Sequence, residues 1–181
     1  MKNHVFILKI DLNQSVPKIW RRVVVSPETR LEKLHWIIQI AMGWTNSHLH
    51  QFTHNRKHYA PNDFEIDNSF DSSDIKLNTL LKKAKDRLFY EYDFGDSWNH
   101  TITLEDIIES EKGMLVPRCI GGKNSCPPED CGGVNGYKTL LKTISNPSHE
   151  DFEDLIEWLG DDFDPFYFDM EEINELFASW N

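Results

Sequence analysis

The feature that most constrains the fold is a strict alternation of apolar and polar side chains near the start of the chain. Phe6, Leu8, Ile10 and Leu12 recur at every second position, which is the period of a strand with one buried face. After a turn around residues 13–17, an apolar run rich in valine predicts a second strand, paired with the first as a hairpin. The chain therefore begins by building an antiparallel sheet.

The next stretch adds a helix and more strands. Leu31, Leu34, Ile38 and Ala41 follow helical spacing, and Gly43 supplies a stop signal. We expect further strands over 48–54, 88–93 and 98–104, a polar loop over 61–76 and a short helix over 77–81. The last two strands form a second hairpin around a Gly-Asp-Ser turn. This order predicts an α+β fold with a mixed, mostly antiparallel sheet, compatible with a β-grasp-like sheet crossed by one helix.

The last third of the chain changes character. A loop rich in cysteine, glycine and proline is expected first, followed by three helices whose apolar stripes pack on the sheet. The third helix begins near Asp169, which with Glu172 resembles a capping box. We see no internal repeat and no long linker. The sequence therefore predicts a single domain over 1–181, with a sheet-and-helix part at 1–116, the loop at 117–136 and an acidic helical part at 137–181.

The formal charge of -11 is concentrated at the C-terminal end. From residue 149 onward there are twelve acidic residues and no lysine or arginine, whereas the rest of the chain is nearly neutral. Such a segment repels nucleic acid and membranes, and it can attract a basic protein partner. The alternative interpretation is that these residues form the solvated faces of helices.

The sequence also predicts the compartment. No stretch approaches the roughly 20 apolar residues that span a bilayer, and the N-terminus lacks the features of a secretion signal. Three cysteines, an odd number, favour a reducing compartment with free or metal-bound thiols. We therefore expect a cytoplasmic protein without a membrane partner.

A histidine-rich segment is the first candidate site. On a strand, His48, His50 and His54 would share one face, with neighbouring positions about 6.6–6.8 Å apart. Two imidazoles at this spacing can bind one metal ion, and imidazole suits zinc, copper, iron or nickel. Alternatively, the histidines line a polar face of the sheet and hydrogen-bond to their neighbours. His48 and His50 are the candidate metal ligands.

The second hairpin carries the second candidate site. Asp93 and Asp96 flank its tip, and His100 lies on the returning strand. These three are the candidate catalytic residues, because carboxylates and an imidazole can hold a divalent metal or activate a water molecule as a general base. The alternative is a tight turn in which the carboxylates accept backbone N–H groups, Gly95 adopts a positive φ and His100 belongs to the core.

The cysteine-rich loop is the third candidate. Cys119, Cys126 and Cys131 lie within thirteen positions, and with one histidine they would complete a Cys₃His zinc site. The alternatives are buried thiols that act as small apolar groups, or a reactive thiol whose pKa is lowered by Lys123 and a nearby helix N-terminus. The glycine run at 132–136 can also cradle an anion.

Four segments carry a resemblance to a known family: residues 17–22, 43–44 with 48–52, 90–100 and 119–137. Together they resemble the plasmid pRiA4b ORF-3-like family, whose members are also labelled TnpR-like proteins of transposons. The match extends over nearly the whole chain. The resemblance implies a mixed α+β domain and an occasional association with mobile elements, and it implies no particular activity.

The sequence leaves open whether the chain is an enzyme. The leading hypothesis is a small cytoplasmic binding or accessory domain, in which the histidine segment, the Asp93/Asp96 hairpin and the cysteine-rich loop form one surface that faces a ligand or partner. The second is a metal-dependent hydrolase or nuclease-like enzyme that uses zinc or another divalent metal, with Asp93 and Asp96 as ligands and His50 or His100 as ligand or base. The third is a nucleic-acid accessory protein of mobile elements, against which the acidic C-terminal segment counts.

Overall fold

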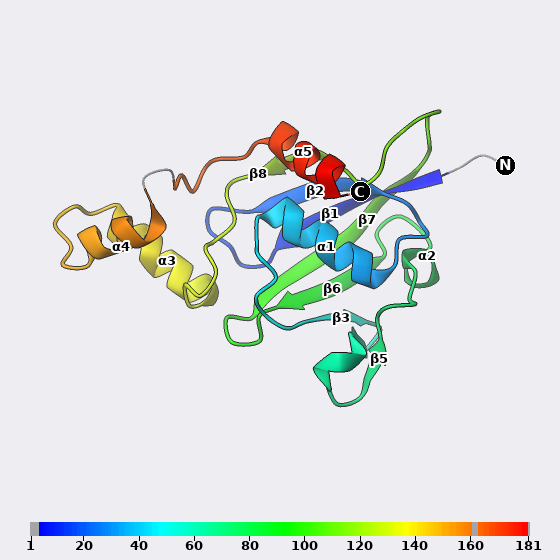
Figure 1. Cartoon of the computed structure of the whole chain (residues 1–181), viewed down its shortest axis with the longest axis horizontal. Coiled ribbons are helices and arrows are strands. Elements are labelled where there is room, and N and C mark those ends of the chain that lie inside the picture. The colour runs from blue at the N-terminus through cyan, green and yellow to red at the C-terminus, as the bar shows by residue number, and fades with distance from the viewer. Residues whose placement is uncertain (1–3, 161–162, 181) are drawn as a thin grey trace.

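The computed structural model describes residues 4–160 and 163–180. Its centre is an eight-stranded sheet with the strand order β5-β4-β3-β6-β7-β1-β2-β8 (Figure 1). Neighbouring strands are antiparallel, except that β4 and β5 are parallel. The strands are β1 (His4–Leu12), β2 (Trp20–Val25), β3 (His50–His54), β4 (Lys57–Ala60), β5 (Ser69–Asp71), β6 (Arg87–Tyr92), β7 (Trp98–Glu109) and β8 (Arg118–Lys123).

The N-terminal alternation produces the expected hairpin. In β1, Phe6, Leu8, Ile10 and Leu12 are buried, while the residues between them are only partly covered. β1 pairs with β2 on one side and with the long strand β7 on the other. Because side chains alternate across a strand, this register directs one face of the three central strands into the core.

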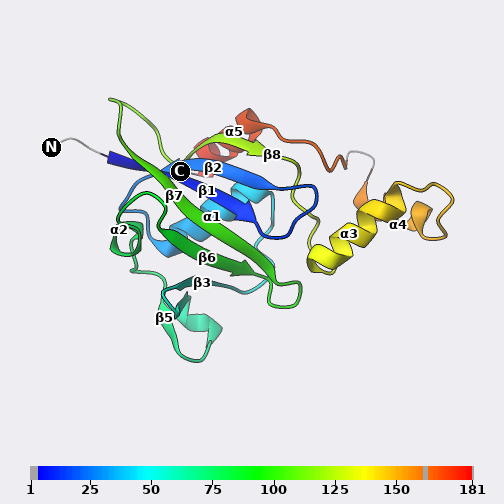
Figure 2. The same cartoon turned by 180° about the vertical axis from the view of Figure 1, so that it is seen from behind.

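Helix α1 (Leu31–Met42) covers that face, and Figure 2 shows the strands in front of it when the molecule is seen from behind. Its residues at helical spacing, among them Leu34 and Ile38, are fully buried. The helix ends at Gly43, whose φ of 87° belongs to the left-handed region that glycine adopts without strain. The α+β class, with a mixed, mostly antiparallel sheet crossed by one helix, is therefore confirmed.

Two segments differ from the sequence prediction. The polar loop expected over 61–76 contains a short 3₁₀ helix (Asn62–Phe64) and β5, which pairs with β4. The loop expected over 117–136 contains β8 and the first turn of a helix. Two adjacent glycines make the sequence of β8 a weak strand former. The strand is stabilised instead by its antiparallel pairing with β2. The true connection, residues 124–132, is called the Cys loop below.

The remaining helices are α2 (Leu77–Leu80), α3 (Gly133–Ile144), α4 (Phe152–Leu159) and α5 (Met170–Trp180). Helix α5 packs beside β8 and α1, where Ile173 and Phe177 join the core. The Asn174 side chain hydrogen-bonds both backbone groups of Cys119 on β8, accepting from its N–H at 2.8 Å and donating to its carbonyl at 2.9 Å. Asp169 accepts backbone N–H groups at the start of α5, as its capping sequence predicts.

Helices α3 and α4 lie beyond one end of the sheet (Figure 1). Helix α3 is anchored because Tyr137 and Leu140 reach the core, whereas no residue of α4 is buried. Helix α4 makes its main contacts with α3, and its Leu159 packs against the core cluster. In the described part of the chain, no helix combines the length and the apolar character that crossing a membrane requires.

Candidate metal centre

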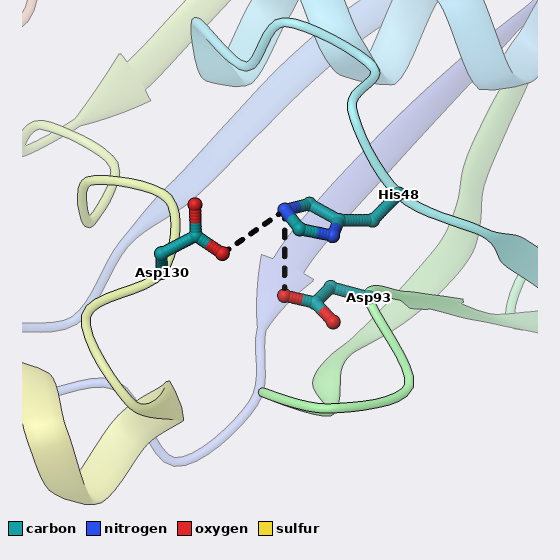
Figure 3. Close-up of side chains that lie close together, drawn as sticks. All are labelled: His48, Asp93 and Asp130. Carbon is teal, nitrogen blue, oxygen red and sulfur yellow. Dashed lines mark ion pairs between the residues drawn. The ribbon is translucent and has the colours of Figure 1, made fainter.

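Three segments that are distant in sequence meet at one end of the sheet: the loop before β3, the tip of the β6–β7 hairpin and the Cys loop. Each contributes one metal-capable side chain, and these are His48, Asp93 and Asp130 (Figure 3). His48 Nε2 lies 3.2 Å from Asp130 Oδ1 and 3.8 Å from Asp93 Oδ2. All three ligand atoms lie within 4.8 Å of one another.

The hairpin tip fixes Asp93. Its backbone N–H donates to the carbonyl of Leu49, its carbonyl accepts from Ser97, and its φ is 58°. One carboxylate oxygen, Oδ1, accepts the N–H of Gly95 at 2.9 Å. The other, Oδ2, is the oxygen that faces His48. The tight turn and the site are therefore compatible, because one oxygen of Asp93 serves each.

The Cys loop presents Asp130 from the opposite side. Trp44 donates from Nε1 to the carbonyl of Pro127 at 3.0 Å, which holds the loop against the end of α1. Glu129 accepts hydrogen bonds from the backbone N–H of Thr45 and from the hydroxyl of Tyr92. Burial, and then the bond to Glu129, raises the pKa of Tyr92 far above its ordinary value. Asp130 follows directly in the chain, with a backbone φ of 60°, and its side chain is exposed.

Glycines allow the loop and the hairpin to approach. Asp96 does not face His48, and its carboxylate accepts the N–H of Gly132 at 3.1 Å. A Cβ on Gly133 would lie 2.4 Å from the carbonyl oxygen of Asp96, and a Cβ on Gly136 would lie 1.8 Å from that of Cys131. Any larger residue at either position would force the backbone apart. The glycine run thus serves close packing at the site.

The donor set fits a transition metal. Zinc bonds to nitrogen and oxygen are about 2.0–2.2 Å long, so two ligands of one tetrahedral ion lie roughly 3.3–3.5 Å apart. The separations of 3.2 and 3.8 Å at His48 bracket that value. His48 Nε2 is buried and makes no hydrogen bond with a described group, although two carboxylates face it. Asp96 and Glu129 lie nearby and add negative charge, which favours a bound cation.

His50 does not join His48. His48 precedes β3, which begins at His50, so the alternation of strand side chains does not relate the two residues. His50 is buried, and its ring stacks on that of His35 at 3.5 Å. Burial, with a smaller contribution from His35, lowers the pKa of His50 to about 3. His50 is therefore a neutral core side chain.

His100 is also enclosed. It has no exposed surface, its ring meets the edge of Trp44, and burial lowers its pKa to about 4. His35 is held by Tyr90 and Asn46, each at 2.8 Å, and burial lowers its pKa to about 4 as well. We call His35, His50 and His100 the inner histidines. Of the predicted catalytic residues, only Asp93 reaches the triad.

The cysteines lie apart from this group. Cys119 is buried on β8, and Cys126 and Cys131 are partly buried in the Cys loop; all three are free thiols. Burial raises the pKa of Cys119 and Cys126, and together with Asp96 it raises the pKa of Cys131 to about 12. This is opposite to the lowering expected from Lys123 and a helix N-terminus. Across residues 4–160 and 163–180, the compact metal-capable group contains no cysteine.

Sequence reasoning missed Asp130 and its neighbour Glu129. Both lie inside the cysteine-rich loop, where the thiols are the more conspicuous candidate ligands. The available signal was an acidic pair among glycines, because a loop that needs several glycines is one that approaches another backbone closely. Acidic residues at such a contact can therefore meet metal-binding side chains from segments that are far away in the sequence.

The fold and site define an α+β domain whose sheet end gathers one histidine and two aspartates. The sequence profile described as plasmid pRiA4b ORF-3-like protein matches residues 4–172. The chain therefore belongs to the plasmid pRiA4b ORF-3-like family.

Two relatives extend this result. The uncharacterized protein y4hQ of Sinorhizobium fredii (strain NBRC 101917 / NGR234) is 35% identical over 180 residues, which covers 96% of this chain and 92% of the relative. The crystal structure of MM3350 from Methanosarcina mazei Go1 has a TM-score of 0.85 and 35% identity, and the match covers 95% of this chain and 98% of that one. Since MM3350 is described as a protein of unknown function, the likeness supports the fold, and the proposal of function rests on the site.

Proposed function

We propose that this chain is a small binding domain that holds a divalent transition metal, zinc foremost, between His48, Asp93 and Asp130. One observation carries the proposal: three separate segments bring a buried, unbonded imidazole nitrogen to within 3.2 and 3.8 Å of two carboxylate oxygens. A histidine that only decorates a surface has no need of such convergence.

The ligand types indicate the metal. Imidazole suits zinc, copper, iron and nickel, whereas carboxylate also suits magnesium, calcium and manganese. Zinc accepts both histidine nitrogen and carboxylate oxygen as ligands, and manganese is the competitor that the two carboxylates also suit. Three protein ligands leave at least one coordination position for water, a substrate or a side chain of a partner.

The test measures metal binding directly. The protein is prepared without a polyhistidine tag, stripped with a chelator and titrated with zinc and with manganese by calorimetry. We expect one equivalent of zinc to bind to the wild type, and His48→Ala, Asp93→Asn and Asp130→Asn each to weaken it by at least about tenfold. Asparagine suits these positions because it tolerates positive φ, and its amide oxygen can still accept the N–H of Gly95.

A matched control lies in the acidic C-terminal segment. His149 Nδ1 and Asp151 Oδ2 are 3.7 Å apart on the surface, with no third ligand from the rest of the described chain. His149→Ala should leave zinc binding unchanged. If the triad variants bind zinc as tightly as the wild type, or if neither metal binds, then His48 is only ion-paired with its neighbours and the proposal is wrong.

A second candidate function is metal-dependent hydrolysis. It is favoured by the incomplete protein coordination, because a metal-bound water at an open position is the usual nucleophile in such enzymes. The inner histidines are enclosed, which leaves Asp93 and Asp130 as the carboxylates next to that water. Zinc- or manganese-dependent cleavage of a generic phosphodiester or ester, lost in Asp130→Asn, would support it. If the metal binds but no substrate is cleaved, the metal-binding proposal stands and the hydrolase proposal is wrong.

A cytoplasmic location is also proposed. It is supported by the three free thiols, which suit a reducing compartment. A nucleic-acid accessory role, suggested by the plasmid association in the family's name, stays a third candidate, against which the acidic C-terminal segment counts. A gel shift with duplex and single-stranded DNA at low salt would test it, since phosphate contacts are strongest there.

A further inference from the structure

A groove lies beside the Cys loop, and Glu129 is one of the residues that line it. Its volume is about 370 Å³, and it runs between the end of α1, the Cys loop and the end of α4. Apolar side chains dominate its lining, and the main ones are Trp44, Pro127, Pro128, Trp158 and Phe163. We call this feature the α4 groove. Cavities of this size with aromatic and proline walls take a bulky apolar side chain.

Helix α4 has an apolar face that the fold covers only in part. Phe152, Leu155, Ile156 and Leu159 recur at helical spacing, which is the pattern of a helix with a buried stripe. In the structure none of them is buried, and Trp158 at the rim of the α4 groove is 51% exposed. In α5, by contrast, the same pattern places Ile173 and Phe177 in the core. The stripe of α4 is thus only partly satisfied within this chain.

The surroundings of the groove are strongly acidic. The face of α4 that turns to solvent carries Glu153, Asp154 and Glu157, and the groove itself carries Glu129. From residue 149 to the end of the chain no lysine or arginine balances these charges. The neighbouring helix α3 carries two lysines, Lys138 and Lys142, which are fewer than these acidic residues. The sign of the local field therefore selects a positively charged partner and repels a second copy of this chain, nucleic acid and anionic membranes.

We propose that the α4 groove docks a basic segment of another protein. An apolar side chain of that segment enters between Trp158 and the two prolines, and its lysines or arginines lie along the acidic face of α4. The combination of an exposed tryptophan anchor with a charged rim is typical of recognition surfaces. This inference does not depend on metal binding, because none of the three proposed ligands lines the groove.

The test uses the full chain and a synthetic probe. A fluorescein-labelled peptide rich in lysine and leucine is titrated by fluorescence anisotropy, with control peptides in which serine replaces the leucines or glutamate replaces the lysines. We expect binding of the first peptide alone, weakening as salt is raised. Trp158→Ser should weaken it by at least about tenfold, and Glu153→Lys/Glu157→Lys should weaken it by a similar factor.

Two matched variants distinguish binding in the groove from nonspecific binding of the peptide to other apolar or acidic parts of the surface. Phe70→Ser removes an aromatic side chain that is also 51% exposed, at the β5 edge of the sheet. Glu171→Lys/Glu175→Lys makes the same change of net charge on α5. Both should bind like the wild type, and circular dichroism should show that all variants fold.

Three results would overturn the proposal. The first is that the lysine- and leucine-rich peptide does not bind. The second is that both charge-reversal variants weaken binding equally while Trp158→Ser does not. The third is a concentration-dependent dimer, detected by sedimentation, that Trp158→Ser abolishes, since it would assign the groove to a second copy of this chain.

Discussion

His48 and the inner histidines show two uses of the same side chain within one fold. His48 sits at the end of the sheet, where two carboxylates face its ring nitrogen. Of the inner histidines, His35 lies on α1, whereas His50 and His100 lie on β3 and β7. All three contact aromatic rings, and His35 also bonds a neutral amide group. The difference lies in the charge of the neighbours rather than in the sequence around each residue, since His48 and His50 are only two positions apart.

The comparison teaches what each environment stabilises. Where carboxylates face an imidazole, a bound metal cation completes the electrostatics. Where aromatic side chains enclose it, the neutral ring is favoured and its pKa falls. The outer position therefore responds to a ligand, and the inner positions respond to acid. Four experiments test this separation, in order of expected effect.

The largest effect is expected from acid. An unfolded histidine takes up its proton near pH 6.5, whereas the inner histidines resist protonation until about pH 3 to 4. Their contribution to stability is thus complete above about pH 6.5 and is lost as the pH falls toward 4, on the order of 2 kcal/mol for each histidine by about pH 5. Urea unfolding at a series of pH values measures this slope.

A variant tests its origin. His50→Phe/His100→Phe should flatten the dependence of unfolding free energy on pH, because fewer buried rings remain to be protonated. Equal stability of the wild type at neutral and mildly acidic pH would contradict the neutral state of these residues.

The next effect concerns the scaffold of the outer site. Gly133→Ala combines a φ of 66° with a Cβ that meets the carbonyl of Asp96 at 2.4 Å, so we expect a loss of about 3 kcal/mol and weaker zinc binding. Gly113→Ala is the control, because its φ is 84° but nothing lies within 4 Å of the added Cβ. That change should cost roughly 1–2 kcal/mol. Equal losses would show that the close approach of loop and hairpin is unimportant.

Zinc itself should stabilise the fold. At a free concentration of about 100 times Kd, a ligand specific to the native state contributes roughly 2.7 kcal/mol, which for a chain of this size raises Tm by about 5–10 °C. Differential scanning calorimetry with and without zinc measures this shift. Asp130→Asn should abolish it while leaving the acid sensitivity in place. A variant that changed both would break the separation between outer and inner regions.

The smallest effect is expected for Tyr92→Phe. The substitution removes the hydroxyl that donates to Glu129 and accepts from Ser47, which we expect to cost about 1–2 kcal/mol. Zinc affinity should fall several-fold although all three ligands are present, because the Cys loop is held less firmly. Calorimetric titration compares it with wild type. Unchanged affinity would mean that the other contacts of the loop suffice to position Asp130.

Much of the fold follows from local pattern. The alternation in β1 and the helical spacing in α1 each bury the residues that they predict, because the period of side chains along an element is fixed by backbone geometry. The strand β8 escaped detection because its stability comes from pairing with β2 rather than from its own residues. The expectation of a single domain stays a prediction.

The site was harder to predict because it is a product of long-range contacts. The sequence identified Asp93 and His48 individually, yet nothing local separates His48 from His50; that distinction depends on where β3 begins. Asp130 meets its partners because Trp44, which follows α1, and Tyr92, at the end of β6, hold the Cys loop by hydrogen bonds. Such contacts leave no periodic trace in the residues that they bring together.

The paired hydrogen bonds of Asn174 have a consequence for solubility. β8 is the last strand of the sheet, and the Asn174 amide satisfies one N–H and one carbonyl of Cys119 that would otherwise be open to a foreign chain. A single side chain thus imitates the next strand and discourages intermolecular sheet extension, the route by which exposed strands aggregate. Truncated variants of this chain that keep β8 but lack α5 should be prone to form fibrils or domain-swapped oligomers.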